Sequence, residues 1–156
     1  MPARATIDDF LDQTHIAFVA VSRDPKAFAN AVYRQLRDGG RILYPVNGSA
    51  DGGHLEGDVS YRQLADVPDP VDGVVVMVPA SAEADVVCQA VERGIPRVWI
   101  HRASAKIAVS DDVRSLCAQA GVRLVDGACP MMFVEPVRGI HRLHRRLARR
   151  HFAGAA

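Results

Sequence analysis

Polar side chains able to bind a phosphate group follow the first apolar segment of the chain. Ser22 and Arg23 come directly after residues 16–21, and Lys26 lies three residues further on. The N–H groups that open the following helix, and the positive end of its dipole, suit a negatively charged phosphate. Ser22 has a structural alternative, because serine is also favoured as a cap of the following turn. Both roles stay open at this stage.

Four more candidates come after later apolar segments. Asn47 directly follows the second apolar segment of the chain, residues 41–46. His101 could face a ligand, although a neutral imidazole more often makes ordinary hydrogen bonds. Pro79 could equally do no more than end a strand. Cys129 is interpreted as a small buried residue rather than a reactive thiol, because no neighbouring basic group is identified that would favour the thiolate.

Sequence signatures of catalysis and of metal binding are absent. The chain has no Ser-His-Asp order, paired-carboxylate motif or nucleophile elbow. Its three cysteines are an odd number without the spacing of metal ligands, so neither a disulfide framework nor a zinc site is expected. We therefore expect a ligand-binding protein without catalysis of its own.

Binding of NAD loses its main support for two reasons. The loop at 22–25 contains no glycine, so the G-x-G-x-x-G fingerprint of dinucleotide binding is missing. The second apolar segment ends in Asn47, where an NAD-binding protein has the carboxylate that holds the ribose.

Five short apolar segments predict the strands that must position these residues. They are residues 16–21, 41–46, 74–78, 97–100 and 122–125. Helical spacing separates them, over 27–36, 80–93 and part of 104–120, with a short helix near 60–65. Strands that alternate with helices form a parallel sheet with helices on both faces, and the ligand lies at the carboxyl ends of the strands. The predicted fold class is therefore α/β.

Local signals predict where two of the helices begin and end. Asp24-Pro25 is expected to open the helix after the first strand, and Gly39-Gly40 to close it. Ser81 is the expected cap of the helix at 80–93, and Gly94 its stop.

Composition places the chain among globular proteins of one domain. It has 156 residues, of which 49% are apolar and 24% charged, and no apolar run approaches the ~20 residues of a membrane-spanning helix. The N-terminal residues 1–15 carry acids where a signal peptide needs a basic segment and then an apolar one. A cytoplasmic protein without a membrane partner is expected.

The C-terminal residues differ sharply in charge from the rest. Residues 1–137 hold all 18 acids against 13 bases, whereas residues 138–156 hold six arginines and no acid. A helix is predicted over 137–150, with Ile140, Leu143 and Leu147 on one face. It could bind nucleic acid, or pack on the acidic body or on a second copy. We favour a protein partner or a homo-oligomer, because only Phe152 is available to stack on bases.

A metal site formed by the C-terminal histidines is not favoured. His141, His144 and His151 have neighbours that would repel a cation, namely the six arginines, and no carboxylate lies nearby in the sequence.

From Ile16 to Pro136 the chain resembles a known family. The family is that of small stand-alone coenzyme A-binding proteins, related to the N-terminal domain of the succinyl-CoA synthetase α subunit. The resemblance rests on the order and spacing of five pieces. They are IAFVAVSRDP, ILYPVN, YRQLADVPDPVD, VVMVPASAEADVVCQAVERGIPRVWIH and GVRLVDGACP.

The resemblance implies a Rossmann-like, doubly wound sheet that holds coenzyme A (CoA) or an acyl-CoA across its carboxyl edge. It implies phosphates near the first loop and adenine toward the later loops, with residues 1–136 as the binding domain and 137–156 as an added basic helix. By position, the implied site residues are Ala20, Val21 and Ser22, then Asn47, then Val78, Pro79 and Ala80, and finally Cys129 and Pro130.

The chain departs from the family pattern at three places. The family usually has glycine at Ala20, Pro-Lys at Gly48-Ser49, and Arg-Pro-Ser at 27–29. Arg23, Lys26 or Arg41 are the candidates to replace the missing charge. Two alternatives to simple CoA binding stay open. The chain could be a subunit of an acyl-CoA or nucleotide-using complex, or a scaffold that acts through the protein or nucleic-acid contacts of its basic helix.

Overall fold

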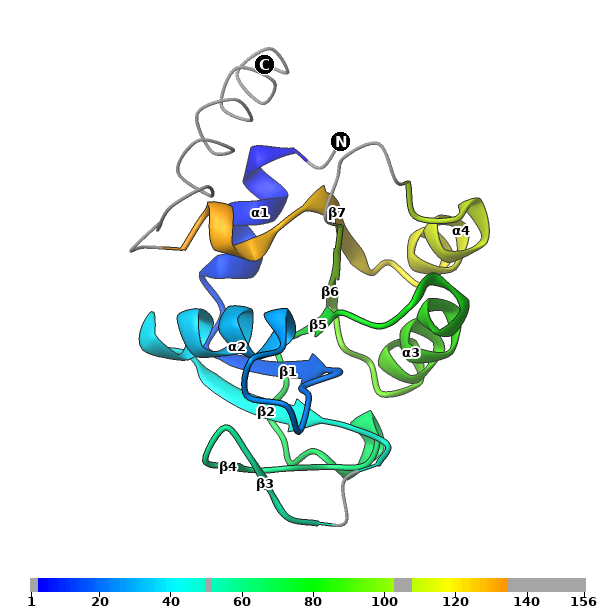
Figure 1. The fold of residues 1–156 in the computed structure, drawn as a ribbon. Coiled ribbons are helices and arrows are strands. Elements are labelled where there is room, and N and C mark those ends of the chain that lie inside the picture. Colours follow the sequence, from blue (N-terminus) through cyan, green and yellow to red (C-terminus); the bar gives the residue numbers. More distant parts are fainter. Residues whose placement is uncertain (1–2, 50–51, 103–107, 135–156) are drawn as a thin grey trace.

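Residues 3–49, 52–102 and 108–134 are described by the computed structural model (Figure 1). The main strands are β1 (His15–Val19), β2 (Ile42–Val46), β5 (Gly73–Val76), β6 (Arg97–His101) and β7 (Arg123–Ala128). The α-helices are α1 (Arg4–Leu11), α2 (Phe28–Asp38), α3 (Ala80–Glu92) and α4 (Asp111–Gln119). The remaining elements are the short strands β3 (His54–Leu55) and β4 (Asp58–Val59) and the 3₁₀ turns η1 (Leu64–Asp66) and η2 (Pro130–Met132).

The five main strands form one parallel sheet in the order β2-β1-β5-β6-β7. Phe18 of β1 lies between Pro45 of β2 and Val75 of β5. The chain therefore moves outward from β1 to β2 and then returns past β1 to β5. This reversal of direction between β1 and β5 is the position at which open α/β sheets bind ligands. The α/β fold class expected from the sequence is confirmed.

Helices cover both faces of the sheet because alternate strand residues point to opposite faces. Val74 and Val76 pack with α3 and α4 in one core cluster, whereas Val75 packs with α1 and α2 in the other. On the α1 and α2 face, the Phe10 ring meets Trp99 edge-on, with ring centroids 5.3 Å apart. None of the described helices is long and apolar enough to cross a membrane.

The acidic N-terminal segment forms a helix, α1, that was not expected from the sequence. Ile7 and Phe10 are buried one helical turn apart and fix it on the sheet. Its acidic face is also tied down, because Asp9 accepts hydrogen bonds from Arg97 at the start of β6 and forms an ion pair with Arg123 at the start of β7. This cluster lies at the amino edge, the end of the sheet at which the strands begin.

Several predicted boundaries need correction. Helix α2 begins at Phe28, not at Pro25, because the Ser22 and Asp24 side chains accept N–H groups in two successive tight turns first. Ser81 lies within the first turn of α3, whose cap is Pro79. The short helix expected near 60–65 is the 3₁₀ turn η1. The glycine stops are confirmed. Gly39 is the C-terminal cap of α2 and is followed by Gly40 at φ 89°, and Gly94, at φ 73°, follows Arg93, the cap of α3.

A two-stranded hairpin, β3–β4, lies between β2 and η1 and was not expected from the sequence. Glu56 and Gly57 form its turn at φ values of 54° and 88°. Positive φ at a glutamate is costly, and three side chains of α2 stabilise it: Asn30 and Arg34 bind its carboxylate and Arg37 its carbonyl. The C-terminal helix expected over 137–150 lies outside the described residues.

Asp9 gives a testable pH dependence. Hydrogen bonding from Arg97, and then from Arg123, lowers the pKa of Asp9 from 3.8 to about 2. A depressed carboxylate pKa stabilises the fold fully above its unfolded value, and this stability is lost as the pH falls from about 3.8 through about 2. We expect Asp9→Asn to lower the melting temperature at neutral pH by about 2–4 °C, or about 1 kcal/mol for a partly exposed and therefore screened pair.

The difference in melting temperature between wild type and Asp9→Asn should disappear as the pH is lowered to about 2. Thermal unfolding at each pH, monitored by circular dichroism, measures this difference. Asp85→Asn, an exposed carboxylate on α3, is the control and should show no comparable gap. A gap that stays constant down to this pH would contradict the assignment.

Candidate functional site

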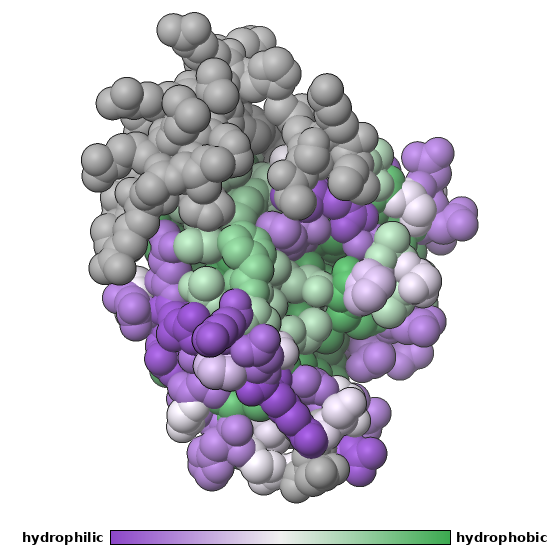
Figure 2. Space-filling view, viewed as in Figure 1, coloured by the Kyte–Doolittle hydropathy of each residue, from purple (hydrophilic) through white to green (hydrophobic). Residues whose placement is uncertain are grey.

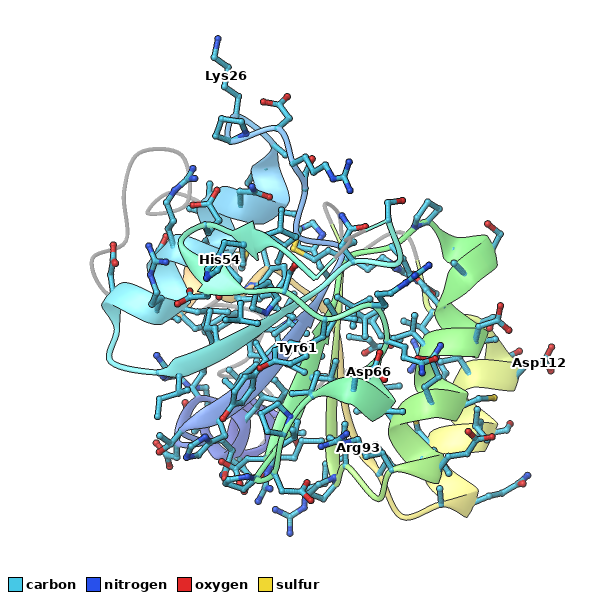
Figure 3. All side chains as sticks on the ribbon, turned by 90° about the horizontal axis from the view of Figure 1, so that it is seen from below. Lys26, His54, Tyr61, Asp66, Arg93 and Asp112 are labelled. Carbon is cyan, nitrogen blue, oxygen red and sulfur yellow. The ribbon has the colours of Figure 1, made fainter. Side chains whose placement is uncertain are left out.

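The loops that follow the strands meet at one end of the sheet, the carboxyl edge. Figure 3 shows Lys26, after β1, at this end and Arg93, before β6, at the other. With the exception of Arg41, the candidates taken from the sequence lie here: Ala20, Val21, Ser22, Arg23 and Lys26 after β1, Asn47 after β2, Val78, Pro79 and Ala80 after β5, His101 at the end of β6, and Cys129 and Pro130 after β7.

Ala20 turns the chain out of the sheet in a left-handed conformation. Its φ is 81°, and its N–H still donates to the Val46 carbonyl at 2.9 Å. A side chain with a β-carbon is strained in this region, whereas glycine is not. The position where the resembling family has glycine therefore keeps the backbone conformation that favours glycine, although this chain has alanine there.

Asn30 holds the loop that begins at Ser22. The Asn30 side chain is 1% exposed. Its Oδ1 accepts the Ser22 N–H at 2.8 Å, and its Nδ2 donates to the Ser22 carbonyl at 2.8 Å. Nδ2 also donates to Glu56 at 2.8 Å, so the hairpin is joined to the same network. One buried amide thus fixes both polar groups of the Ser22 residue.

This arrangement limits what Ser22 can offer a ligand. Its N–H is already taken by Asn30, and its Oγ accepts the Asp24 N–H at 3.1 Å. The turn-capping role weighed for Ser22 is therefore present in the structure. The hydroxyl proton and the positive end of the α2 dipole can still be directed at a phosphate.

Asn47 connects the loops after β1 and β2. Its Nδ2 donates to the Val21 carbonyl at 2.7 Å, and its Oδ1 accepts the Ser49 N–H at 2.8 Å. The Arg23 guanidinium donates to the Ser49 carbonyl, which ties the two loops together a second time. The Val21 side chain is completely buried, so this residue can meet a ligand only through its backbone.

Of the three cations expected at the carboxyl edge, two lie there and one does not. Arg23 and Lys26 are exposed, and Lys26 points away from the body into solvent (Figure 3). Arg41 lies at the opposite edge, beside the start of β2, where it donates to the Leu11 carbonyl. It therefore does not supply charge to the carboxyl edge, and that expectation is wrong.

Apolar side chains occupy the edge between α2 and the start of α3. The rings of Phe28 and His101 lie with their centroids 5.5 Å apart. Phe28 is 46% exposed, and Met77 and Val78 after β5 are half-buried. Figure 2 shows apolar surface in the middle of this view with hydrophilic residues around it. A flat or aliphatic ligand group could therefore lie beside the polar loop after β1.

Cys129 is a buried thiol. It is 7% exposed, and burial raises the pKa of its thiol to about 11. At neutral pH it is protonated and a poor nucleophile. The interpretation of Cys129 as a small buried residue agrees with this environment. Pro130 is also buried, where it opens η2.

A buried ion pair was missed in the sequence. Both guanidinium Nη atoms of Arg102, the residue after His101, donate to the two carboxylate oxygens of Glu83 in the first turn of α3. Arg102 is 8% exposed and Glu83 2%, and the hydrogen bond to Glu83 raises the pKa of Arg102. The pair fastens α3 to the end of β6, and its charges compensate each other instead of facing a ligand. Nothing in the spacing of residues 83 and 102 signals such a pair.

Metal binding finds no support within the described part of the chain, which has no group of three histidine, cysteine or acidic side chains suited to an ion. The histidines at 141, 144 and 151 lie outside it.

A parallel sheet with a switch between β1 and β5, and a glycine-like turn before a helix that opens toward the edge, define a Rossmann-like ligand-binding domain. Comparison of the sequence with known families is more specific. The chain belongs to the family described as "CoA binding domain", whose model matches residues 14–135.

Individual proteins show the same relationship. The chain is 28% identical over 96 residues, 60% of its length, to the α subunit of an ADP-forming acetate–CoA ligase II from Pyrococcus furiosus. The match spans about a fifth (20%) of that subunit.

Two solved structures resemble the fold closely. A conserved hypothetical protein from Pyrococcus furiosus is 31% identical with a TM-score of 0.66, and the match covers 75% of this chain and 96% of that one. A hypothetical protein from Pyrococcus horikoshii is 26% identical with a TM-score of 0.73, and the match covers 92% of this chain and 91% of that protein's chain.

The strain at Ala20 leads to a stability prediction. Ala20→Gly removes the left-handed penalty of about 1–2 kcal/mol but adds about 0.5–1 kcal/mol of unfolded-state entropy. We expect a net gain of about 0.5–1 kcal/mol and a melting temperature higher by about 1–4 °C. The matched control is Ala84→Gly, an exposed position inside α3, which should lose about 1 kcal/mol. Equal losses in both variants would contradict the proposed strain.

Proposed function

We propose that this chain binds CoA or an acyl-CoA at the carboxyl edge and carries out no reaction on its own. The observation that carries the proposal is the loop after β1, which turns at Ala20, is fixed by Asn30 and leads into α2 at the β1–β5 switch. Membership of the CoA-binding domain family supports the choice of ligand.

The binding groups follow from the chemistry of CoA, which joins phosphates to an apolar pantetheine arm and a flat adenine. The Ser22 hydroxyl, Arg23, Lys26 and the positive end of the α2 dipole suit the phosphates. The surface that includes Phe28 and His101 suits the uncharged parts.

The absence of catalysis is proposed from the state of the groups that could react. The Cys129 thiol is buried and protonated, and the Ser22 hydroxyl oxygen accepts the Asp24 N–H. Neither is prepared as a nucleophile, because activation requires a neighbouring base or a lowered pKa.

A second function is supported by the similarity to one subunit of an acetate–CoA ligase, of which the chain spans only about a fifth (20%). In this alternative the chain provides the CoA site of a complex, and the catalytic groups come from a partner. Binding of CoA to the isolated chain, with no turnover until that partner is added, distinguishes the alternative.

Ligand binding is tested by thermal shift and calorimetry with CoA, acetyl-CoA, NAD and ATP. A ligand that binds only the folded state stabilises it by about 2.7 kcal/mol at 100 times its Kd. For a chain of this size we expect CoA or acetyl-CoA to raise the melting temperature by about 5–10 °C, and NAD to raise it little or not at all. Stabilisation by NAD equal to or above that by CoA would overturn the proposal, and no stabilisation by any ligand would favour the scaffold alternative.

The position of the phosphates is tested by Ser22→Asp. An aspartate can still accept the Asp24 N–H, so the loop should keep its fold. Its charge would repel a phosphate and weaken CoA binding by at least about tenfold, or ~1.4 kcal/mol. Ser115→Asp, the same change at an exposed position on α4, is the control and should leave the Kd unchanged. Equal Kd values for both variants would place the phosphates elsewhere.

A further inference from the structure

A concavity lies away from the carboxyl edge, where α1 ends and β2 begins. Its volume is about 360 Å³. Three separate parts of the chain form it: the second half of α1, the turn between α2 and β2, and the residues after η2. In Figure 1, α1 and η2 lie next to each other. The lining residues are Asp8, Leu11, Asp12, Gly39, Arg41, Phe133 and Val134.

The acidic groups of this concavity have only exposed, weakly held partners in the body of the protein. Asp12 forms no ion pair within the described ranges, and Asp8 is paired only with Arg4 on the same helix, where both side chains are about half exposed (47% and 49%). Exposed pairs of this kind contribute little to stability. Arg41 lines the concavity too and interacts electrostatically with Asp12, but it donates its hydrogen bond to the Leu11 carbonyl. Within the described part of the chain neither carboxylate is held in a buried ion pair, so both can exchange their present neighbours for the cations of a basic partner.

We propose that residues 138–156 of the same molecule, the tail segment, dock in this concavity. The first argument is reach. Phe133 and Val134 are both part of the lining, and the tail segment begins only four residues after Val134. Four residues span at most about 14 Å. So short a tether gives an effective concentration on the order of millimolar, which favours docking within one molecule over docking on a second copy.

The second argument is chemical complementarity. The tail segment has six arginines and no acid, which matches Asp8 and Asp12. Its Ile140, Leu143 and Leu147 recur at the spacing of one helix face, which matches the apolar part of the lining. A helix of this length is marginal in water unless it packs on a surface. Docking satisfies the charges and the apolar stripe together, whereas nucleic-acid binding leaves the stripe unexplained.

The proposal does not depend on CoA binding. The concavity lies at the amino ends of β1 and β2, opposite the loops that contain Ser22 and Asn47. Changes in the concavity should therefore leave the Kd for CoA unchanged, and failure of one proposal says nothing against the other.

The test is hydrogen–deuterium exchange of the full chain, read by mass spectrometry on peptides from the tail segment. In wild type we expect slow exchange there, and in Asp8→Lys/Asp12→Lys exchange at least about tenfold faster, because the docked state is lost. The matched control is Asp85→Lys/Glu92→Lys, the same change of charge at exposed positions on α3, which should exchange like wild type. Replacing Arg142 and Arg146 by glutamate in the Asp8→Lys/Asp12→Lys background should restore protection.

Three outcomes overturn the proposal. The first is equal exchange in wild type and in Asp8→Lys/Asp12→Lys. The second is protection that disappears on dilution, together with a doubled mass by light scattering, which would show docking on a second copy. The third is protection that appears only after duplex DNA is added. Circular dichroism of each variant confirms that the fold is retained.

Discussion

The carboxyl edge depends on one constraint: the buried amide of Asn30 must have partners for both its oxygen and its nitrogen. A buried polar group without a hydrogen bond costs about 1–3 kcal/mol, so the surroundings of Asn30 are not free to vary. They consist of the Ser22 backbone and the Glu56 carboxylate. Helix α2, the loop after β1 and the β3–β4 hairpin are thereby fixed relative to one another, and the position of the candidate phosphate groups follows from this.

The sheet could be predicted because its signals are local. Each strand is a short run of apolar residues, and Gly40 and Gly94 end their helices by a conformation that glycine favours. Helix α1 carries the same kind of signal, Ile7 and Phe10 one turn apart, in a segment that was interpreted only for its acidic charge. The start of α2 was misplaced because the side chains of Ser22 and Asp24 stabilise turns that compete with the helix.

The candidate site could be predicted only in outline. The rule that ligands bind at the carboxyl ends of strands brings the correct loops together, but it does not say which groups remain for a ligand. Ser22 illustrates this, since its N–H bonds to a residue eight positions away. Arg102 and Glu83 illustrate it again, since two charges 19 positions apart meet only after α3 has packed against β6. Asn30 did have a signal in the sequence. It is a polar residue on the buried face of α2, one helical turn before Tyr33 and about two turns before Leu36.

The outer side of β2 has a consequence for self-association. An edge strand normally exposes free N–H and C=O groups that another chain can pair with, which leads to strand exchange or fibrils. Here the Pro45 carbonyl accepts the Tyr61 N–H, and proline has no N–H of its own. The Asn47 N–H donates back to Tyr61. The Pro45 carbonyl and the Asn47 N–H are therefore already bonded, which disfavours backbone pairing between copies at the end of β2.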